Sequence, residues 1–278
     1  MRKLIVVASV AASLLLGCDQ KSTDKRETLS ETLVAKSLSN MVPVKGGEFL
    51  MGDFGPLVGE KLPFSINQDD KVLHKVVLSD FSISKYKITN DDYNKYLQIT
   101  GVKKAPIHIF LKNYPSLQKG YYSVGVTWQQ AKDYCQWLGK ESGKKFDLPT
   151  EAQWEYAAAG GESYPYAGSD NIRDVAYYAS NANERLHPVG EKRENGFDLY
   201  DMSGNAAEWC TDWMSRYENT RVTDPQGPAE NPGHHKKIVR GGSYLANERD
   251  MDIRHRSVQT YDTSEPHIGF RVVLNPIQ

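Results

Sequence analysis

The 278-residue sequence has three cysteines, Cys18, Cys135 and Cys210, and none between Gly242 and Phe270. It has no Cys-x-x-Cys pair, no Gly-x-Ser-x-Gly elbow and no phosphate-cradling loop, so the motifs of dithiol redox proteins, α/β-hydrolases and P-loop enzymes are missing. The formal net charge of -1 offers no excess of positive charge to neutralise a phosphate backbone. We therefore expect no nucleic-acid partner.

Long hydrophobic runs are also missing. The apolar run Leu4–Leu16 follows two basic residues and is too short to span a bilayer, but it is typical of a secretory signal. The run ends in Leu-Leu-Gly-Cys18, which resembles the lipobox of bacterial lipoproteins. Residues 1–17 are therefore predicted to be a lipoprotein signal peptide and Cys18 to be acylated, which gives a stable membrane anchor. The alternative is an ordinary cleaved signal with an incidental cysteine.

The location that follows is the bacterial cell envelope, with the chain facing the periplasm. Asp19 resembles the signal that retains such proteins at the inner membrane, and the outer membrane is the alternative location. Residues 18–40 are mostly polar and are expected to form the lipidated cysteine and a flexible tether. Leu29, Leu33 and Leu38 form one weak helical face, too short to be stable alone. The folded domain is predicted over residues 41–278.

Threonines mark the beginnings of three predicted helices. Helices are expected over 90–99, 128–140 and 151–159, and the hydroxyls of Thr89, Thr127 and Thr150 accept from otherwise unpaired backbone amides. At the second and third helices a glutamine three residues on completes a capping box. Strands are predicted at 72–78, 81–83 and 272–274, and the glycine-interrupted stretch 41–52 is predicted to form two paired strands. Residues 164–278 have little periodicity, so long loops over a few short strands are expected.

Four motifs occur together: Leu-Pro-Thr-Glu-Ala-Gln-Trp-Glu-Tyr at 148–156, Met-Ser-Gly-Asn-Ala-Ala-Glu-Trp-Cys at 202–210, Arg-Gly-Gly-Ser at 240–243, and Ile-Gly-Phe-Arg at 268–271. Together, and across about residues 41–275, they resemble the formylglycine-generating enzyme family, also called the sulfatase-modifying-factor domain. The resemblance implies a C-type-lectin-like α+β fold, in a single domain poor in regular secondary structure.

Family enzymes oxidise a substrate cysteine with two thiols that hold copper between the last two motifs. Here the segment from Tyr244 to Ser257 has no cysteine, so neither copper nor formylglycine-generating activity is expected. Met251 and His255 alone make a weak soft-metal site. A second branch of the family holds iron through a His-x3-His-x-Glu motif on a separate domain, which this sequence lacks, so no iron is expected either. No residue is assigned as catalytic.

Calcium is the metal that the resemblance suggests. The stretch 203–208 resembles a family calcium loop, in which Asn205 and Glu208 supply side-chain oxygens and the carbonyls of Ser203, Gly204 and Ala206 complete the cage. The sequence departs from the family at residue 207, where alanine replaces an aromatic residue. The alternative is a structural Gly-Asn turn with Glu208 paired to an arginine. A second family calcium loop has no clear counterpart in residues 177–184.

Arginines and cysteines of the same segments have structural interpretations. Arg240, Ser243 and Arg271 of the signature motifs, with Arg254 and Arg256 between them, are expected to brace loops through carboxylates and carbonyls. Cys135 and Cys210 lie where family members often carry cysteine, and an oxidising location permits them to pair. Two buried free thiols are the alternative.

We interpret the chain as a non-catalytic envelope lipoprotein that binds a partner protein in the periplasm, as an accessory factor or as an immunity protein that neutralises a toxin. Long loops on a rigid scaffold suit this function. The alternative is a periplasmic oxidoreductase or maturation enzyme with a cysteine-independent site. The candidate partner-binding loops are 53–68, 106–120 and 216–237, and the candidate anchors are Phe110, Tyr114, Tyr121, Tyr122 and Tyr217.

Overall fold

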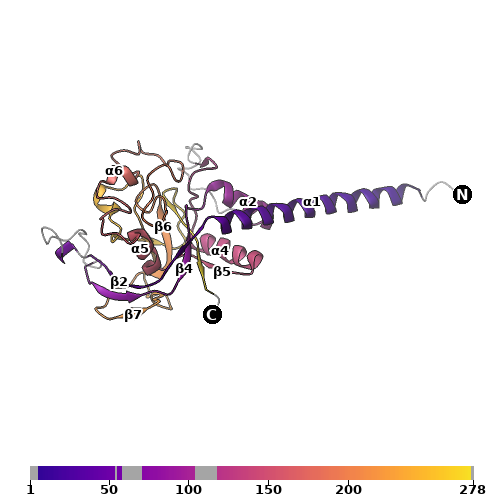
Figure 1. Cartoon of the computed structure of the whole chain (residues 1–278). Coiled ribbons are helices and arrows are strands. Elements are labelled where there is room, and N and C mark those ends of the chain that lie inside the picture. Colours follow the sequence, from indigo (N-terminus) through magenta and orange to yellow (C-terminus); the bar gives the residue numbers. More distant parts are fainter. Residues whose placement is uncertain (1–5, 54, 58–70, 104–117, 277–278) are drawn as a thin grey trace.

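The computed structural model describes residues 6–53, 55–57, 71–103 and 118–276, with side chains from Thr23 onward apart from Pro56. A long helix, α1 (Val6–Ser39), leads into a domain of short strands and helices joined by long loops (Figure 1). This α+β architecture, poor in regular structure, confirms the predicted fold class. None of the helices in the described part of the chain is both long and apolar enough to cross a membrane.

Three small sheets form the framework of the domain. The first has the order β1-β4-β11-β5, the second β10-β6-β8-β9 and the third β2-β3-β7. Pairing within them is antiparallel except for β10 with β6 and β3 with β7, which are parallel. The strand bounds are β1 (Met41–Val44), β2 (Glu48–Met51), β3 (His74–Val77), β4 (Phe81–Ser84), β5 (Lys145–Asp147), β6 (Ala207–Trp213), β7 (Val222–Thr223), β8 (Lys236–Arg240), β9 (Arg256–Thr260), β10 (Ile268–Gly269) and β11 (Val273–Asn275).

The predicted helices are confirmed at α2 (Asn90–Thr100), α4 (Trp128–Ser142) and α5 (Glu151–Ala159). Thr89 accepts from the amide of Asp92, and both predicted capping boxes are present at Thr127 and Thr150. Each of these helices ends at a glycine with positive φ, as left-handed C-caps favour. The short elements are α6 (Ile172–Val175), η1 (Gly55–Leu57) and η3 (Glu248–Met251).

Strand pairing corrects one prediction. The stretch 41–52 was expected to form two strands paired with each other, but β1 pairs with β4 and β2 pairs with β3. The glycines between them therefore carry the chain from one sheet to the next. A side-chain carbon added at Gly46 would lie 2.1 Å from the carbonyl oxygen of Leu78, so the passage of the chain between the two sheets requires glycine at this position. The closing strand was correctly expected and is β11.

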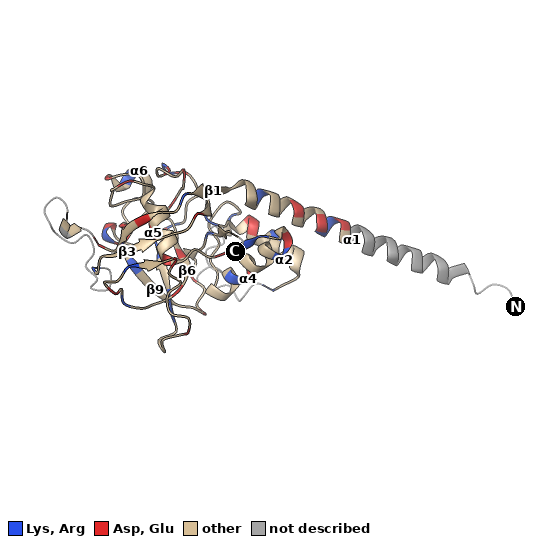
Figure 2. Ribbon diagram, turned by 60° about the horizontal axis from the view of Figure 1, so that its bottom comes forward, with Lys and Arg blue, Asp and Glu red and all other residues tan. Residues whose placement is uncertain are grey.

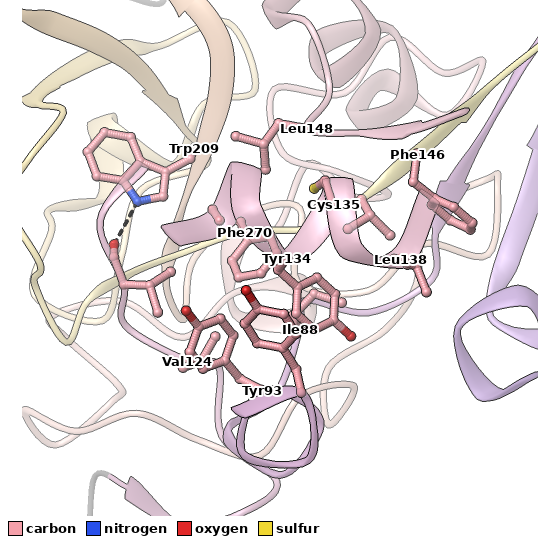
Figure 3. Close-up of a cluster of buried hydrophobic side chains, with 14 of the residues drawn as sticks. Ile88, Tyr93, Val124, Tyr134, Cys135, Leu138, Phe146, Leu148, Trp209 and Phe270 are labelled. Atoms are coloured by element: carbon pink, nitrogen blue, oxygen red, sulfur yellow. Dashed lines mark hydrogen bonds between the residues drawn. The ribbon is translucent and has the colours of Figure 1, made fainter. Parts of the chain in front are cut away.

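Two large apolar clusters fill the domain on either side of the framework. One joins α4 and the C-terminal strands through Tyr134, Trp209 and Phe270. Figure 3 shows the rings of Tyr134 and Phe270 against each other, and the indole of Trp209 donates to the carbonyl of Val126. The other lies around Trp154 of α5. β6 contributes residues to both clusters and was not predicted as a strand, because its seven residues are almost all buried and show no alternation.

The end of α1 corrects the expectation of a flexible tether over 18–40. Leu33 is only 1% exposed and joins the cluster of α4, while Ser30 donates to Glu141 at 2.7 Å and Lys36 pairs with Asp92 at 2.5 Å. A leucine face that is too weak to hold an isolated helix is stable here because α2 and α4 cover it. The C-terminal third of α1 is therefore part of the domain.

Candidate functional site

The segment from Tyr244 to Ser257, where family enzymes carry their thiols, is tightly packed in this chain. Tyr244 and Met251 are fully buried, and Met251 packs against Ile172, Ala176 and Tyr178. A side-chain carbon at Gly242 would lie 2.1 Å from the methyl of Met251, so the thioether directly covers the glycine of the Arg-Gly-Gly-Ser motif. Asp252, Arg254, His255 and Arg256 are also buried, so the interior of this segment holds both apolar and charged side chains.

Beneath the segment lies a buried ion-pair cluster centred on α5. Arg240 is fully buried and donates to Glu151 and Glu155, and to the carbonyls of Ile253 at 2.8 Å and Arg254 at 3.1 Å. The carbonyl contacts bind the C-terminal part of the thiol-free segment to β8. The two glutamates, four residues apart on one helix face, are thus held by a cation and do not form a free acid pair.

Arg256 completes this cluster. Its guanidinium binds Glu151 with two bonds, of 2.7 and 2.8 Å, donates to the carbonyl of Ser215 at 3.0 Å, and stacks on the ring of Tyr217 at 3.8 Å. Burial alone would raise the pKa of Glu151, but Arg256 and Arg240 outweigh it and lower that pKa. A bidentate, charge-assisted pair of this kind fixes geometry as well as energy.

Arg254 and Arg271 bind other loops. Arg254 pairs with Asp252 at 3.4 Å and donates to the carbonyl of Tyr164 at 3.2 Å. Arg271 donates to the carbonyls of Ser84 and Tyr200, both at 2.8 Å. Ser243 is buried and its hydroxyl accepts from the amide of Leu245. These residues tie together segments that are far apart in the sequence.

Glu208 does not fit the calcium loop expected for residues 203–208. Its carboxylate is fully buried, and one oxygen accepts from Lys87 while Arg271 binds both oxygens at 2.6 and 2.8 Å. The indole of Trp154 adds a bond of 2.9 Å. Burial would raise the pKa of Glu208, but Arg271 and Lys87 lower it to about 2. A carboxylate that already faces two buried cations is no ligand for a third.

The other side-chain oxygen of the expected cage is also engaged. The amide of Asn205 accepts from the backbone N–H of His187 at 3.1 Å and donates to its carbonyl at 3.1 Å. Asn205 adopts a φ of 64°, and Gly204 lies against the carbonyl of Tyr177. Ser203 donates to the carbonyl of Met251. The contacts match the alternative interpretation, a Gly-Asn turn with Glu208 paired to an arginine.

The remaining metal candidates are placed apart. In the weaker second loop, the side chain of Asn181 accepts from Tyr178 and donates to Ala176, which makes it a turn residue. The Nε2 atom of His255 lies 3.6 Å from a carboxylate oxygen of Asp250, whereas the side chain of Met251 is buried in an apolar cluster. The part of the chain that the structure describes contains no group of three or more His, Cys, Asp or Glu side chains arranged to hold a metal.

Cys135 and Cys210 are free thiols, so the structure does not contain the disulfide that we considered. Cys135 lies on α4 within the first apolar cluster (Figure 3), and Cys210 lies on β6 within the second. Burial raises the pKa of both thiols well above the usual value. The side chain of Cys18 lies outside the described residues.

The expected surface anchors divide into three groups. Tyr121 is 50% exposed, as an anchor should be, whereas Tyr122 is buried and Tyr217 is half-buried over Arg256, so these two are corrected to structural residues. Phe110 and Tyr114 lie outside the described residues. The exposed Leu245 was missed, because nothing in its neighbours shows that the ring of Tyr244 turns inward and leaves it outside.

An aromatic face surrounds these exposed residues. Tyr177 stacks on His187 with ring centroids 3.6 Å apart, and both lie beside the apolar cluster of Tyr122 and Tyr244. We define the aromatic face by its exposed and partly exposed members Tyr121, Tyr177, His187 and Leu245. A cavity of about 520 Å³ adjoins it at Tyr121 and is lined on the other side by Lys36 and Asn40 of the α1 end.

The fold and these contacts define a single α+β domain with a filled, ion-paired interior and a loop-built surface. The sequence of residues 26–276 matches the model of the sulfatase-modifying factor enzyme 1-like domain, and the chain belongs to this family. The match begins at residue 26, within α1, so it includes the helix segment that packs on the domain.

Curated relatives differ in how much of them this chain covers. It is 30% identical over 261 residues to the serine/threonine-protein kinase pkn1 of Chlamydia pneumoniae, spanning 86% of this chain but only 38% of that protein. It is 28% identical to the formylglycine-generating enzyme of Streptomyces coelicolor, over 85% of this chain and 89% of that one. It is also 28% identical to the chaperone protein LppX of Paenibacillus barcinonensis, over 98% of this chain and 99% of that one.

Solved structures share the fold. Treponema denticola variable protein 1 superposes with a TM-score of 0.69 at 22% identity, covering 85% of this chain and 95% of that one. PvdO from Pseudomonas aeruginosa superposes with a TM-score of 0.69 at 24% identity, covering 85% of this chain and 94% of that one. These likenesses confirm the family fold that the motifs predicted.

Proposed function

We propose that this chain is a non-catalytic lipoprotein of the cell envelope that binds a partner protein in the periplasm and acts as its accessory factor. One observation carries the proposal: the chain aligns from end to end with a relative named as a chaperone, signal segment included. The Chlamydia relatives are more than twice as long, so their kinase name is no guide to this chain.

The packing of the thiol-free segment supports a binding function. Catalysis by family enzymes needs two soft sulfur donors, and this segment offers an apolar interior and arginines with carboxylate or carbonyl partners instead. The two thiols of the described domain are buried in other parts of the core. Their raised pKa values keep them protonated and poorly nucleophilic.

The aromatic face supplies the contact surface in this proposal. Tyr121 and Leu245 expose half of their area on loops that a rigid interior holds in place. Tryptophan, tyrosine and arginine residues near the centre of an interface carry most of its binding energy, so Tyr121 is the expected main contact. Lys119 and Lys192 lie over the rings of Tyr121 and Tyr177, so the rim of the face is polar, as at transient interfaces.

Photo-crosslinking in living cells tests the proposal. A photoreactive phenylalanine analogue replaces Tyr121 or Leu245, and replaces the exposed Lys75 of β3 as the matched control. We expect one adduct of defined mass at the first two positions and none at the third. Equal labelling at all three positions, or none at any, would contradict a partner-binding face.

Deletion of the gene then separates the candidate functions. If the chain is an accessory factor, the amount of active crosslinked partner falls several-fold. If it is an immunity protein, the partner stays active and damages the cell. The alternative function is that of a cysteine-independent maturation enzyme, which the relatives named formylglycine-generating enzymes suggest. This alternative requires stoichiometric copper or iron in the purified chain.

A further inference from the structure

The docked part of α1 fixes the direction from which the chain reaches the domain. A side-chain carbon added at Gly101, the C-cap of α2, would lie 3.6 Å from the guanidinium of Arg26, so Arg26 lies beside the end of α2. The hydroxyl of Ser30 donates to the carboxylate of Glu141 in the last turns of α4. From Arg26 to Ser39 the helix therefore runs along α2 and α4, and its N-terminal side emerges at their C-terminal ends. Figure 1 shows α1 leaving the domain on this side.

We define the basal end of the domain as these two C-terminal ends with the first docked turn of α1. Basic residues are in excess there, whereas the whole chain has a net charge of -1. The exposed cationic residues of the basal end are Lys25, Arg26, Lys103, Lys140, Lys144 and Lys145, and its exposed anionic residues are Asp24, Glu27, Glu31 and Glu141. Figure 2 shows basic residues on α4 and on the adjoining part of α1.

The chain between the predicted lipid anchor and the docked helix is short. Seven residues lie between Cys18 and Arg26, so eight residue steps join the two positions. They span about 12 Å if they stay helical, at 1.5 Å per residue, and at most about 28 Å if fully extended. Both lengths are small beside a domain of this size, so an acylated Cys18 leaves the basal end as the part of the domain nearest the bilayer.

We propose that the basal end rests on the headgroups of anionic phospholipids, and that the aromatic face and the β2-β3-β7 sheet are turned away from the membrane. The inference rests on the acylation of Cys18 that the proposed function includes. Each lysine or arginine within a Debye length of an anionic surface adds to the attraction, and the nearby carboxylates offset part of it. The acyl chains supply the anchoring, and the lysines set the orientation.

This orientation leaves the aromatic face open to a partner. Tyr121 lines the same cavity as Lys36 and Asn40, at the opposite end of the docked helix from Arg26. Three helical turns therefore separate the aromatic face from the basal end. The sheet of β2, β3 and β7 lies on the far side of the domain in Figure 1.

Fluorescence quenching on vesicles tests the orientation. The full-length chain, purified from cells that acylate lipoproteins, is mixed with vesicles of phosphatidylethanolamine and phosphatidylglycerol that carry a nitroxide on the headgroup. A small thiol-reactive fluorophore is placed at Lys144→Cys or at Lys75→Cys, two exposed lysines on opposite sides of the domain. The native thiols at 135 and 210 are buried and stay unlabelled.

We expect several-fold stronger quenching at position 144 than at position 75. The Lys140→Glu/Lys145→Glu variant of the labelled chain should lose most of that difference, and so should vesicles without phosphatidylglycerol. Flotation of each sample is measured in parallel. A chain that does not float refutes the acylation, and with it the location in the proposed function. A chain that floats but is quenched equally at both positions refutes the orientation alone.

Discussion

Glu208 and Asp212 lie four residues apart on β6, and both are almost completely buried, at 0% and 6% exposure. Glu208 meets Lys87 and Arg271, whereas Asp212 accepts only from the amide of Glu151 and the hydroxyl of Thr211. The pKa of Glu208 falls to about 2. Burial, with the neighbouring charge of Glu151, raises the pKa of Asp212 to about 6.

The difference shows that partners decide the energetic role of a buried carboxylate more than depth does. Glu208 compensates two cations in the interior of the domain, and they compensate it. Asp212 has hydrogen bonds and feels the attraction of the charges of Arg256 and Lys237, but burial and the charge of Glu151 outweigh this attraction, so its charge is a cost to the folded state. It lines a cavity of about 530 Å³ with His74 and Tyr217, where a neutral side chain would serve the same hydrogen bonds.

Glu208→Gln should have the largest effect on stability. It leaves Lys87 and Arg271 buried without their ion-pair partner, with Asp201 as the buried carboxylate that remains near them. Breaking a buried pair in this way costs about 3–5 kcal/mol, a large share of the stability of an ordinary domain. Urea unfolding followed by tryptophan fluorescence measures the loss. The matched control is Glu48→Gln, which removes exposed ion pairs to Lys75 and Arg221 and should leave the midpoint almost unchanged.

A second variant keeps this test decisive if Glu208→Gln does not fold. Adding Lys87→Met to Glu208→Gln removes one of the two uncompensated cations and should recover part of the stability. A double variant that is no more stable than Glu208→Gln alone would show that Lys87 and Glu208 are not energetically coupled.

Asp212→Asn should act in the opposite direction. The asparagine oxygen still accepts from Glu151 and Thr211, and the burial penalty of the charge disappears, so the variant should gain about 1–3 kcal/mol near neutral pH. The same urea titration measures the gain. A loss of stability would mean that Asp212 has a favourable charge partner in solution and that the contrast with Glu208 is false.

The pH dependence of stability sharpens the comparison. The folded-state pKa of Glu208 is depressed, so its contribution is present above its ordinary value of 4.5 and is lost as the pH falls toward about 2. The folded-state pKa of Asp212 is raised, so its penalty is present above about pH 6 and is relieved as the pH falls to its ordinary value of 3.8. The gain from Asp212→Asn should therefore vanish by about pH 4. A gain that persists there would exclude this linkage.

Calcium removal should have the smallest effect. Because Glu208 is committed to two cations and Asn205 to the backbone of His187, addition of a calcium chelator should leave the melting temperature unchanged. Thermal scans with and without chelator measure this. A drop that is restored by calcium would reinstate the loop of residues 203–208 as a metal site.

Local signals in the sequence predicted the helices of the domain. Thr127 and Thr150 reveal their helices because a cap and its glutamine partner lie within four residues. The docking of α1 was missed because Leu33 becomes a core residue only when α2 and α4 are in place.

The site was predicted less completely, for a related reason. The motifs predicted Arg271 to brace loops and Glu208 to bind calcium or pair with an arginine. The pair that forms joins residues 63 positions apart, and Lys87 joins from 121 positions away. No spacing rule connects such residues, so the calcium interpretation and the ion-pair interpretation were equally compatible with the sequence. The exposure of Leu245 and the burial of Tyr122 likewise depend on how distant loops meet.

The most direct test of a binding rather than catalytic function is mass spectrometry of a cysteine-containing peptide. The peptide is incubated in air with the purified, copper-treated chain, with the Streptomyces coelicolor relative as the positive control. We predict aldehyde formation with the relative and unchanged peptide with this chain. Conversion of the peptide thiol to an aldehyde by this chain would contradict the account.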